Sequence, residues 1–251
     1  MKISIVTPTY NSAETLRDTL ESILSQSYDD YEVLLQDAGS KDGTIALAKE
    51  FEPKFGGRLK IVSEPDKGLY DGFNKGAQRA VGDVIGVLNS DDFYTSSEVL
   101  ETIANAFEEH SDLDAVYADV HYVDPSDTKH IVRYYSSKSF EPKRMRMGYM
   151  PAHPTFYCRK ECYERYGYFD LSYRVAADFE NLLRLIYVNT IRTLYIQEDW
   201  VTMRTGGASS SGFQSHRRII RDHFRAFRKN NVKVNPFMYF WRYVEKLREF
   251  C

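Results

Sequence analysis

The sequence has few cysteines and no long apolar run. Cys158, Cys162 and Cys251 are its three cysteines, and no Cys or His pair near the first two completes the ligand spacing of a zinc site. We therefore expect reduced thiols. The first apolar run, residues 3–6, is far shorter than a signal peptide or the roughly 18 residues of a membrane span. These absences predict a cytoplasmic protein.

Glycine-rich phosphate loops are also missing. The first predicted strand is followed by PTYN, which matches neither GxGxxG nor GxxxxGK. The sequence therefore lacks the motif of dinucleotide-binding proteins and that of P-loop proteins at this position. The same absence disfavours a sugar-phosphate nucleotidyltransferase, since those enzymes usually begin with a glycine-rich loop that ends in basic residues. Any phosphate must then be neutralised in another way.

Positive charge is scarce until the end of the chain. The net charge is -3, yet residues 214–251 hold ten Lys or Arg against three acids, or +7, which leaves -10 for the rest. The aromatic residues of this segment are Phe224, Phe227, Phe237, Tyr239, Phe240, Trp241 and Tyr243. Basic and aromatic residues together are typical of a helix on an anionic membrane surface. The alternative is a helix pair that packs on the core or forms a homodimer. Nucleic-acid binding has no motif here and is not expected.

The first half of the chain alternates between strand-like and helix-like stretches. Strands are predicted at residues 2–7, 31–36, 59–62 and 84–88, and helices at 12–24, 42–51 and 68–80. Strands joined by helices pair in parallel through right-handed crossovers. This pattern predicts an α/β fold with a mostly parallel open sheet flanked by helices.

The pattern changes after Asp92. We predict a helix at 97–107, antiparallel strands at 115–123 and 130–135 joined by the turn DPSD, and an irregular loop at 140–153. A helix at 177–187, a strand pair or extended segment at 193–203, and a C-terminal helical extension from residue 213 follow. With 251 residues, the chain is expected to form one compact domain with an appended segment.

The loops after the four predicted parallel strands are polar. Open α/β sheets bind ligands at the carboxyl ends of their strands. Asp91 and Asp92 repel each other at such an end unless a cation holds them, and hard oxygen ligands suit Mg²⁺ or Mn²⁺ bridged to phosphates. The alternative is a solvated helix start. Asp37, directly after a strand, either accepts hydrogen bonds from a base or ribose or is a turn aspartate.

In this order, PTYN, DAGSKDGT, EPDKGLYDGFNKG and LNSDD resemble the nucleotide-binding half of the family 2 glycosyltransferases, which have the GT-A fold. The resemblance is greatest to bacterial polysaccharide-assembly enzymes that carry EPDxGxYDAxNKG. It spans residues 1–95 and extends more weakly to about residue 205. It implies a GT-A domain at 1–212, with a nucleotide-binding half (1–95) and an acceptor half (96–212), followed by basic aromatic helices at 213–251.

The resemblance also implies roles for individual residues of this chain. The base pocket would be lined by Thr7, Pro8 and Tyr10, with Glu14 near the ribose or base and Asp37 on the base edge. The segment facing the nucleotide and donor sugar would contribute Lys67, Asp71, Asn74 and Lys75. Asp91 would contact the ribose or sugar and assist Asp92, the metal ligand. A polar helix face is the alternative for Asn74 and Lys75.

The departures from the family pattern concern the metal and the base. Many relatives have an aspartate where Asn89 stands, so this site has two carboxylates rather than three. In the family the general base is usually the Asp of an acidic pair that begins a helix. Asp178 matches that position, with Ala177 in place of the first acid and Glu180 as a second candidate. In a first helical turn the dipole favours the ionised carboxylate that a base needs, although a capping role is the alternative.

Two further residues complete the expected site. His153 would approach the diphosphate or the acceptor, or else is structural, and Arg204 would neutralise the departing diphosphate. The resemblance thus implies an inverting, metal-dependent transferase that moves sugar from a nucleoside-diphosphate sugar, UDP-linked, to a glycan or lipid-linked glycan on the inner face of the membrane. A non-catalytic nucleotide-sugar-binding protein is the rival, suggested by Ala177.

Overall fold

The structure, a computed structural model, describes residues 1–206 and 212–248, without the side chains of 212–216 and 243–248. The strands are β1 (Ile3–Thr9), β2 (Tyr31–Asp37), β3 (Leu59–Ser63), β4 (Val84–Val87), β5 (Phe93–Tyr94), β6 (Ala115–Asp124), β7 (Asp127–Tyr135), β8 (Tyr157–Arg159) and β9 (Thr193–Arg204). The helices are α1 (Leu16–Leu24), α2 (Thr44–Phe51), α3 (Leu69–Arg79), α4 (Val99–Glu109), α5 (Lys160–Tyr166), α6 (Ala177–Leu182), α7 (Gly212–Lys229) and α8 (Pro236–Arg248). Short turns of helix are η1 (Glu52–Phe55), η2 (Pro142–Met147), η3 (His153–Thr155) and the π-helical η4 (Leu183–Val188).

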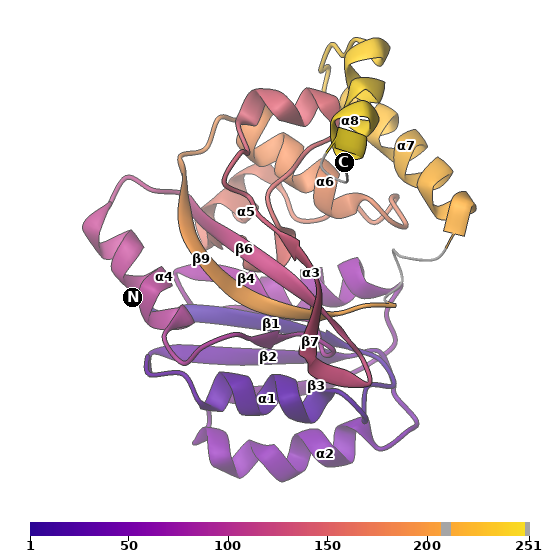
Figure 1. Ribbon diagram of the computed structural model, residues 1–251. Coiled ribbons are helices and arrows are strands. Elements are labelled where there is room, and N and C mark those ends of the chain that lie inside the picture. The colour runs from indigo at the N-terminus through magenta and orange to yellow at the C-terminus, as the bar shows by residue number, and fades with distance from the viewer. Residues whose placement is uncertain (207–211, 249–251) are drawn as a thin grey trace.

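One open sheet in the order β3-β2-β1-β4-β8-β6-β9-β5 runs through the molecule, and β7 pairs with β6 beside this path (Figure 1). Pairing is parallel among β1 to β4, as the first half of the sequence predicts, and again between β6 and β9. The pairs β4–β8, β6–β8, β6–β7 and β5–β9 are antiparallel. The α/β class with an open sheet flanked by helices is therefore confirmed, with its parallel character concentrated in the first half.

Helices cover both faces of the sheet and enclose two apolar cores. One core joins α1, α2 and α4 to the sheet, and the other joins α3, α5, α6 and α7 to the opposite face. Every residue of β1 and β2 is buried, as expected of strands covered on both sides. Close contact of α3 with β1 requires Gly76, because a Cβ there would lie 2.5 Å from Val6 Cγ1. This contact fixes the start of α3, and with it the EPDKG loop, beside the end of β1.

Several element predictions need correction. The first helix begins at Leu16 rather than at Ser12, because Ser12 and Thr15 use their hydroxyls to bind Ser90. Residues 193–203 form one strand, as the extended-segment alternative predicts, whereas the predicted irregular loop at 140–153 contains η2 and the start of η3. The short strands β5 and β8 and helix α5 were not predicted. They pair or pack on longer elements, and their own sequences are too short to show a period.

The C-terminal helices divide their aromatic residues between the core and the surface. Phe227 and Tyr239 are buried in the core that contains α6, whereas Phe237 is 87% exposed and Trp241 is 49% exposed. The alternative of a helix pair packed on the core thus describes Phe227 and Tyr239, and the membrane role stays a prediction. Throughout the described residues, each helix is too short or too polar to cross a bilayer. Cys158 and Cys162 are buried free thiols, and Cys251 lies outside the described residues.

Candidate active site

The loops that follow β1, β2 and β4 are joined by hydrogen bonds. The Ser12 hydroxyl lies 2.8 Å from the Ser90 hydroxyl, and Thr15 Oγ1 donates to the Ser90 carbonyl at 2.8 Å. Asn11, held at a φ of 48°, accepts a bond from the Lys41 amide at its side-chain oxygen. Thr19 Oγ1 donates to the Asp92 carbonyl at 2.7 Å. The carboxyl ends of these strands therefore form one connected rim, where the sequence placed the ligand.

Asp37 is buried at this rim and accepts several hydrogen bonds. Its carboxylate receives the amides of Gly39 (2.9 Å) and Ser40 (3.0 Å), the Ser40 hydroxyl, and the Ser63 hydroxyl at the end of β3. The turn-aspartate alternative thus describes its contacts in this structure. A base edge that bound here would share the carboxylate with these donors.

Asp92, the predicted metal ligand, is buried, with 2% of its surface exposed. Burial, and next the charge of Asp91, raise the pKa of Asp92 to about 8, while a hydrogen bond from Asn89 Nδ2 at 2.9 Å opposes that rise. The Asn89 side-chain oxygen is buried and has no hydrogen-bond partner among the described residues. Burying an ionised carboxylate that has one hydrogen bond, beside an amide oxygen that has none, is unfavourable, and a cation would relieve both.

The donor set at this rim fits a divalent cation held jointly with a ligand. Among the described residues no three His, Cys, Asp or Glu side chains are grouped around a common point as metal ligands. Asp91 and Asp92 therefore provide two carboxylates, with Asn89 beside them. Mg²⁺ in proteins is commonly bound by one or two carboxylates together with substrate phosphates. The residues fit such an ion, with the remaining ligands coming from water and a diphosphate.

Arg204 joins the end of β9 to the Asp91 loop. Its guanidinium donates to the Asp91 carbonyl and to the Asp18 carboxylate, and it lies 5.1 Å from the centre of the Phe93 ring. The Arg204 side chain is 9% exposed, and these contacts hold it at the loop of Asp91 and Asp92, the metal-ligand loop. The structure thus brings Arg204 to the predicted site, paired with an acid and a carbonyl.

The segment from Lys67 to Lys75 is anchored by its own polar groups. Asp71 accepts the Lys67 amide at 2.9 Å. Asn74 binds the carbonyl and the amide of Phe169 at 2.8 and 3.0 Å, and Lys75 pairs with Glu64 at 3.0 Å. Asn74 therefore links α3 to the second half of the chain. Its contacts are those of a positioning residue.

The remaining base-pocket candidates lie at the end of β1. Thr7 is fully buried and its hydroxyl has no partner among the described residues, and Pro8 packs beside Gly72. Tyr10 is 63% exposed and Glu14 is also exposed. An exposed tyrosine at a strand end is free to stack on a planar base, so the structure leaves that role open to it.

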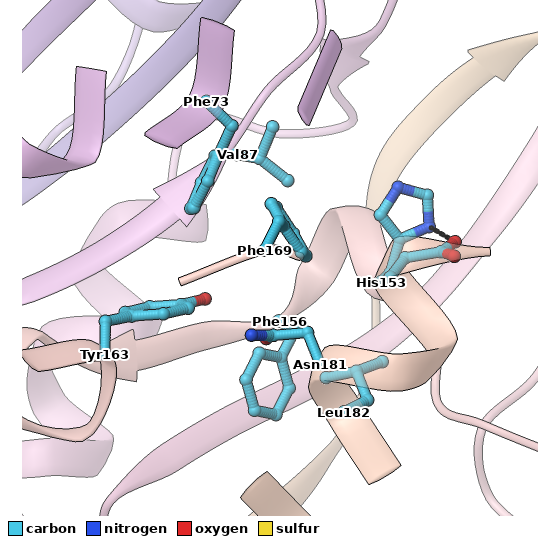
Figure 2. A pocket seen from close by; sticks show the side chains of 9 residues that line it. Phe73, Val87, His153, Phe156, Tyr163, Phe169, Asn181 and Leu182 are labelled. Carbon is cyan, nitrogen blue, oxygen red and sulfur yellow. Dashed lines mark ion pairs between the residues drawn. The ribbon is translucent and has the colours of Figure 1, made fainter. Parts of the chain in front are cut away.

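Asp178 lies at the start of α6 and faces His153. Its Oδ2 is 3.6 Å from His153 Nδ1, drawn as the dashed line in Figure 2, and its Oδ1 is 3.4 Å from the Tyr70 hydroxyl. Burial lowers the pKa of His153, and the charge of Asp178 opposes that shift. At neutral pH the imidazole is therefore mostly uncharged, so Asp178 lacks a permanent cation beside it. Glu180, by contrast, is fully buried and pairs with Arg184 at 3.1 Å.

A small cavity adjoins Asp178 on the apolar side. Its volume is about 10 Å³, room for about one water. Figure 2 shows Phe73, Val87 and Phe169 around it, from α3, β4 and the loop after α5. A sugar cannot enter this space. The cavity matters because Val87 and Asp178 share it, which places the base candidate beside the strand that leads to Asp91 and Asp92.

Helix α7 supports α6 from behind. The His223 ring stacks on Phe179 with centroids 3.7 Å apart, and Phe227 meets Phe179 edge-on at 5.5 Å. Asn230 donates to Glu180 at 3.0 Å. The C-terminal helices therefore fix the helix that carries Asp178, a role the sequence did not indicate.

Tyr122 on β6 is a site residue that the sequence did not single out. Burial raises the pKa of its phenol; the guanidinium of Arg133 opposes that rise, and the negative charges of Asp92 and Asp178 add to it. Since both charges act on its phenol, Tyr122 lies near the loop of Asp91 and Asp92 and near the helix that carries Asp178. Its place depends on how β6 crosses the sheet, and no local motif marks it.

Comparisons with known proteins show the family of the chain. The family model described as Glycosyl transferase family 2 matches residues 4–163. A PGL/p-HBAD biosynthesis glycosyltransferase of Mycobacterium tuberculosis is 31% identical over 193 residues, which cover 77% of this chain and 73% of that protein. The putative glycosyltransferase EpsE of Bacillus subtilis is 37% identical over 92 residues, 36% of this chain and 33% of EpsE.

Solved structures share the fold. A fragment of S. aureus TarS in complex with UDP-GlcNAc has a TM-score of 0.72 at 19% identity, covering 90% of this chain and 66% of that one. This chain spans 39% of a longer TarS structure. The mannosyltransferase PcManGT from Pyrobaculum calidifontis, with GDP-Man and Mn²⁺, has a TM-score of 0.65 at 18% identity, covering 94% and 66%. From its sequence match, and with a fold similar to that of the GT-A enzymes, the chain belongs to glycosyltransferase family 2.

Proposed function

We propose that this glycosyltransferase is a metal-dependent, inverting enzyme that moves a sugar from a UDP-linked donor to a hydroxyl of a glycan or lipid-linked glycan. The observation that carries the proposal is that Asp178, from the second half of the chain, lies beside β4, the strand that leads to Asp91 and Asp92. Asp91 and Asp92 lie at the end of β4, and Asp178 shares a cavity with Val87 of that same strand. A donor bound at Asp91 and Asp92 would present its sugar toward Asp178.

In this mechanism Asp178 accepts the proton of the acceptor hydroxyl. The oxygen forms a bond to the anomeric carbon while the bond from that carbon to the diphosphate oxygen breaks, and the electron pair leaves with the diphosphate. One displacement inverts the anomeric configuration. Tyr70 steadies the base, since its hydroxyl binds the Val175 carbonyl and lies 3.4 Å from Asp178. A positioned base contributes about 10² to 10⁴-fold in rate.

The negative charge that develops on the leaving group falls near Asp91 and Asp92. A divalent cation held by these carboxylates supplies neutralisation of the diphosphate oxygens. Arg204, which donates to the Asp91 carbonyl, keeps this loop in place. The related folds hold UDP-GlcNAc in one structure and GDP-Man in another, so the fold accommodates either base. We propose the uridine donor because the resemblance of the ordered strand-end motifs implies it.

The test is a panel of nucleotide sugars with Mg²⁺ or Mn²⁺, scored by diphosphate release and by thermal shift, with EDTA as control. Asp178→Asn is expected to lose about 10² to 10⁴-fold in transfer while UDP binds as in the wild type. Asp112→Asn, the same change at an exposed acid, should leave both unchanged. Near-normal transfer by Asp178→Asn would refute the base assignment.

A non-catalytic nucleotide-sugar-binding protein is the second candidate. One observation favours it: Ala177 stands where relatives usually have an acid, and it is fully buried. In that case the panel would show thermal shifts with donor but no diphosphate release with any acceptor.

We further propose that α8 contacts an anionic membrane surface that holds a lipid-linked acceptor. Phe237 is 87% exposed and Met238 is 49% exposed, next to the basic face of α7. Removing residues 214–251 would also remove Phe227 and Tyr239 from the core, so point variants are the cleaner test. The double variant Phe237→Ser with Met238→Ser should weaken flotation with anionic liposomes. Val81→Ser, an equally apolar exposed site, should not. A homodimer through α8 would instead appear as a change in molar mass.

A further inference from the structure

Arg133, on β7, carries a charge for which the sequence suggested no role. It lies opposite Tyr122 in the β6–β7 pairing, so the two side chains share a face of the sheet. Its guanidinium is 5.4 Å from the Tyr122 ring centre and 5.9 Å from that of Tyr135. Tyr135 is fixed in turn, because its hydroxyl donates to the Met150 carbonyl at 2.7 Å. Two aromatic rings therefore hold the guanidinium in one region.

The β6–β9 pairing connects that region to the loop of Asp91 and Asp92. In the β6–β9 pairing Tyr122 is level with Met203, the residue before Arg204, and Arg204 binds Asp91. The charges of Asp92 and Asp178 both act on the Tyr122 phenol, as described above. Arg133 thus lies over a side chain that is near Asp92 and Asp178 and two strands from Arg204.

No anion pairs with Arg133 in the described part of the chain. Its guanidinium forms no hydrogen bond there and has no carboxylate within 4.0 Å, although the side chain is exposed. Other arginines of the second half of the chain differ, because Arg204 is bound by Asp18 and Arg184 by Glu180. A guanidinium offers five N–H donors in a planar fork that matches a phosphate. Arg133 therefore has donors available for a ligand anion that binds near Asp91 and Asp92.

We propose that Arg133 binds the diphosphate of the nucleotide, in the donor and in the product. This inference rests on the proposed function, because it requires a nucleoside diphosphate at the rim. The rings of Tyr122 and Tyr135 orient the fork, and the guanidinium adds a second positive group on the side of the diphosphate away from Arg204. Arg133 is then a binding residue for the leaving group, supplied by an edge strand rather than by a strand-end loop.

The test compares UDP with uridine by calorimetry in Mg²⁺, for the wild type, Arg133→Gln and Arg133→Lys. Arg133→Gln is expected to weaken UDP binding about 10 to 100-fold and to leave uridine binding unchanged. Arg133→Lys should recover part of the loss, because it keeps the charge without the fork. Lys138→Gln, the same loss of charge at an exposed residue just beyond β7, should bind UDP as the wild type does.

Two results would overturn the proposal. One is UDP binding by Arg133→Gln within about twofold of the wild type, and the other is an equal loss for uridine, which would mean a distorted site. A thermal melt of each variant shows whether the fold is retained, and Arg133→Lys supplies the comparison if the glutamine variant melts early. If the wild type binds none of UDP, GDP or CDP, the donor class of the proposed function fails, and this inference fails with it.

Discussion

The buried carboxylate of Asp92 makes cation binding depend on pH. With its pKa at about 8 in the ligand-free protein, roughly a tenth of Asp92 is ionised at pH 7 and roughly nine tenths at pH 9. If the cation binds only the protein with Asp92 ionised, its apparent affinity is the intrinsic affinity multiplied by the ionised fraction. Mg²⁺ affinity in the presence of saturating UDP should therefore rise about tenfold between pH 7 and pH 9 and then level off.

Calorimetry at pH 7 in buffers of different ionisation enthalpy measures the proton released per Mg²⁺ bound, and about 0.9 is expected. Asp91→Asn removes the neighbouring charge, which is the second cause of the shift after burial. That variant should bind Mg²⁺ more weakly overall, with the steep part of its profile moved to lower pH. A flat affinity from pH 7 to pH 9 without proton release would refute a buried, protonated Asp92 as the metal ligand.

Folding raises the pKa of Asp92, so the folded protein holds a proton that the unfolded chain releases. This group therefore makes the free energy of unfolding fall as pH rises from about 4 to about 8. Asp92→Asn should raise the melting temperature of the ligand-free protein at pH 9. Gly86→Ala should destabilise by about 1–3 kcal/mol or more in urea unfolding, because its Cβ would lie 2.1 Å from the Tyr157 ring. Phe227→Ala should cost about 3–5 kcal/mol, measured in the same way, and an unchanged midpoint would show that α7 does not belong to the core.

The sequence predicts the parallel half of the fold well because each of its elements carries its own period and its own end signal. Strand-end loops then meet at one rim by topology alone, which is why Asp37, Asp91 and Asp92 could be placed together. The second half was harder to predict. Strand β5 has two residues and β8 has three. They form because β5 pairs with β9, and β8 pairs with β4 and β6. A segment of two or three residues is too short to show hydrophobic periodicity.

Individual side-chain roles show the same limit. Asn74 was expected at the nucleotide, yet its amide is used by Phe169, 95 residues away in sequence. Asp37 was expected at a base edge, and its carboxylate receives donors from its own turn and from Ser63. A motif specifies which residue occupies a loop, whereas the partner of that residue depends on segments that fold against it from elsewhere.

Arg133 and the C-terminal helices show what long-range packing adds to a family pattern. The sequence presents residues 214–251 as a basic aromatic tail, but α7 stacks His223 on Phe179, the residue after Asp178. A helix that supported only a membrane surface would have no reason to bury a histidine whose pKa is held low by burial and by Arg242. Burying that ring against the base helix makes sense if α7 fixes α6. Residues 214–251 then have exposed aromatic residues such as Phe237 and buried ones such as Phe227, which pack toward the helix of Asp178. A substitution among the buried residues should therefore change the rate of sugar transfer even where liposome binding is unchanged.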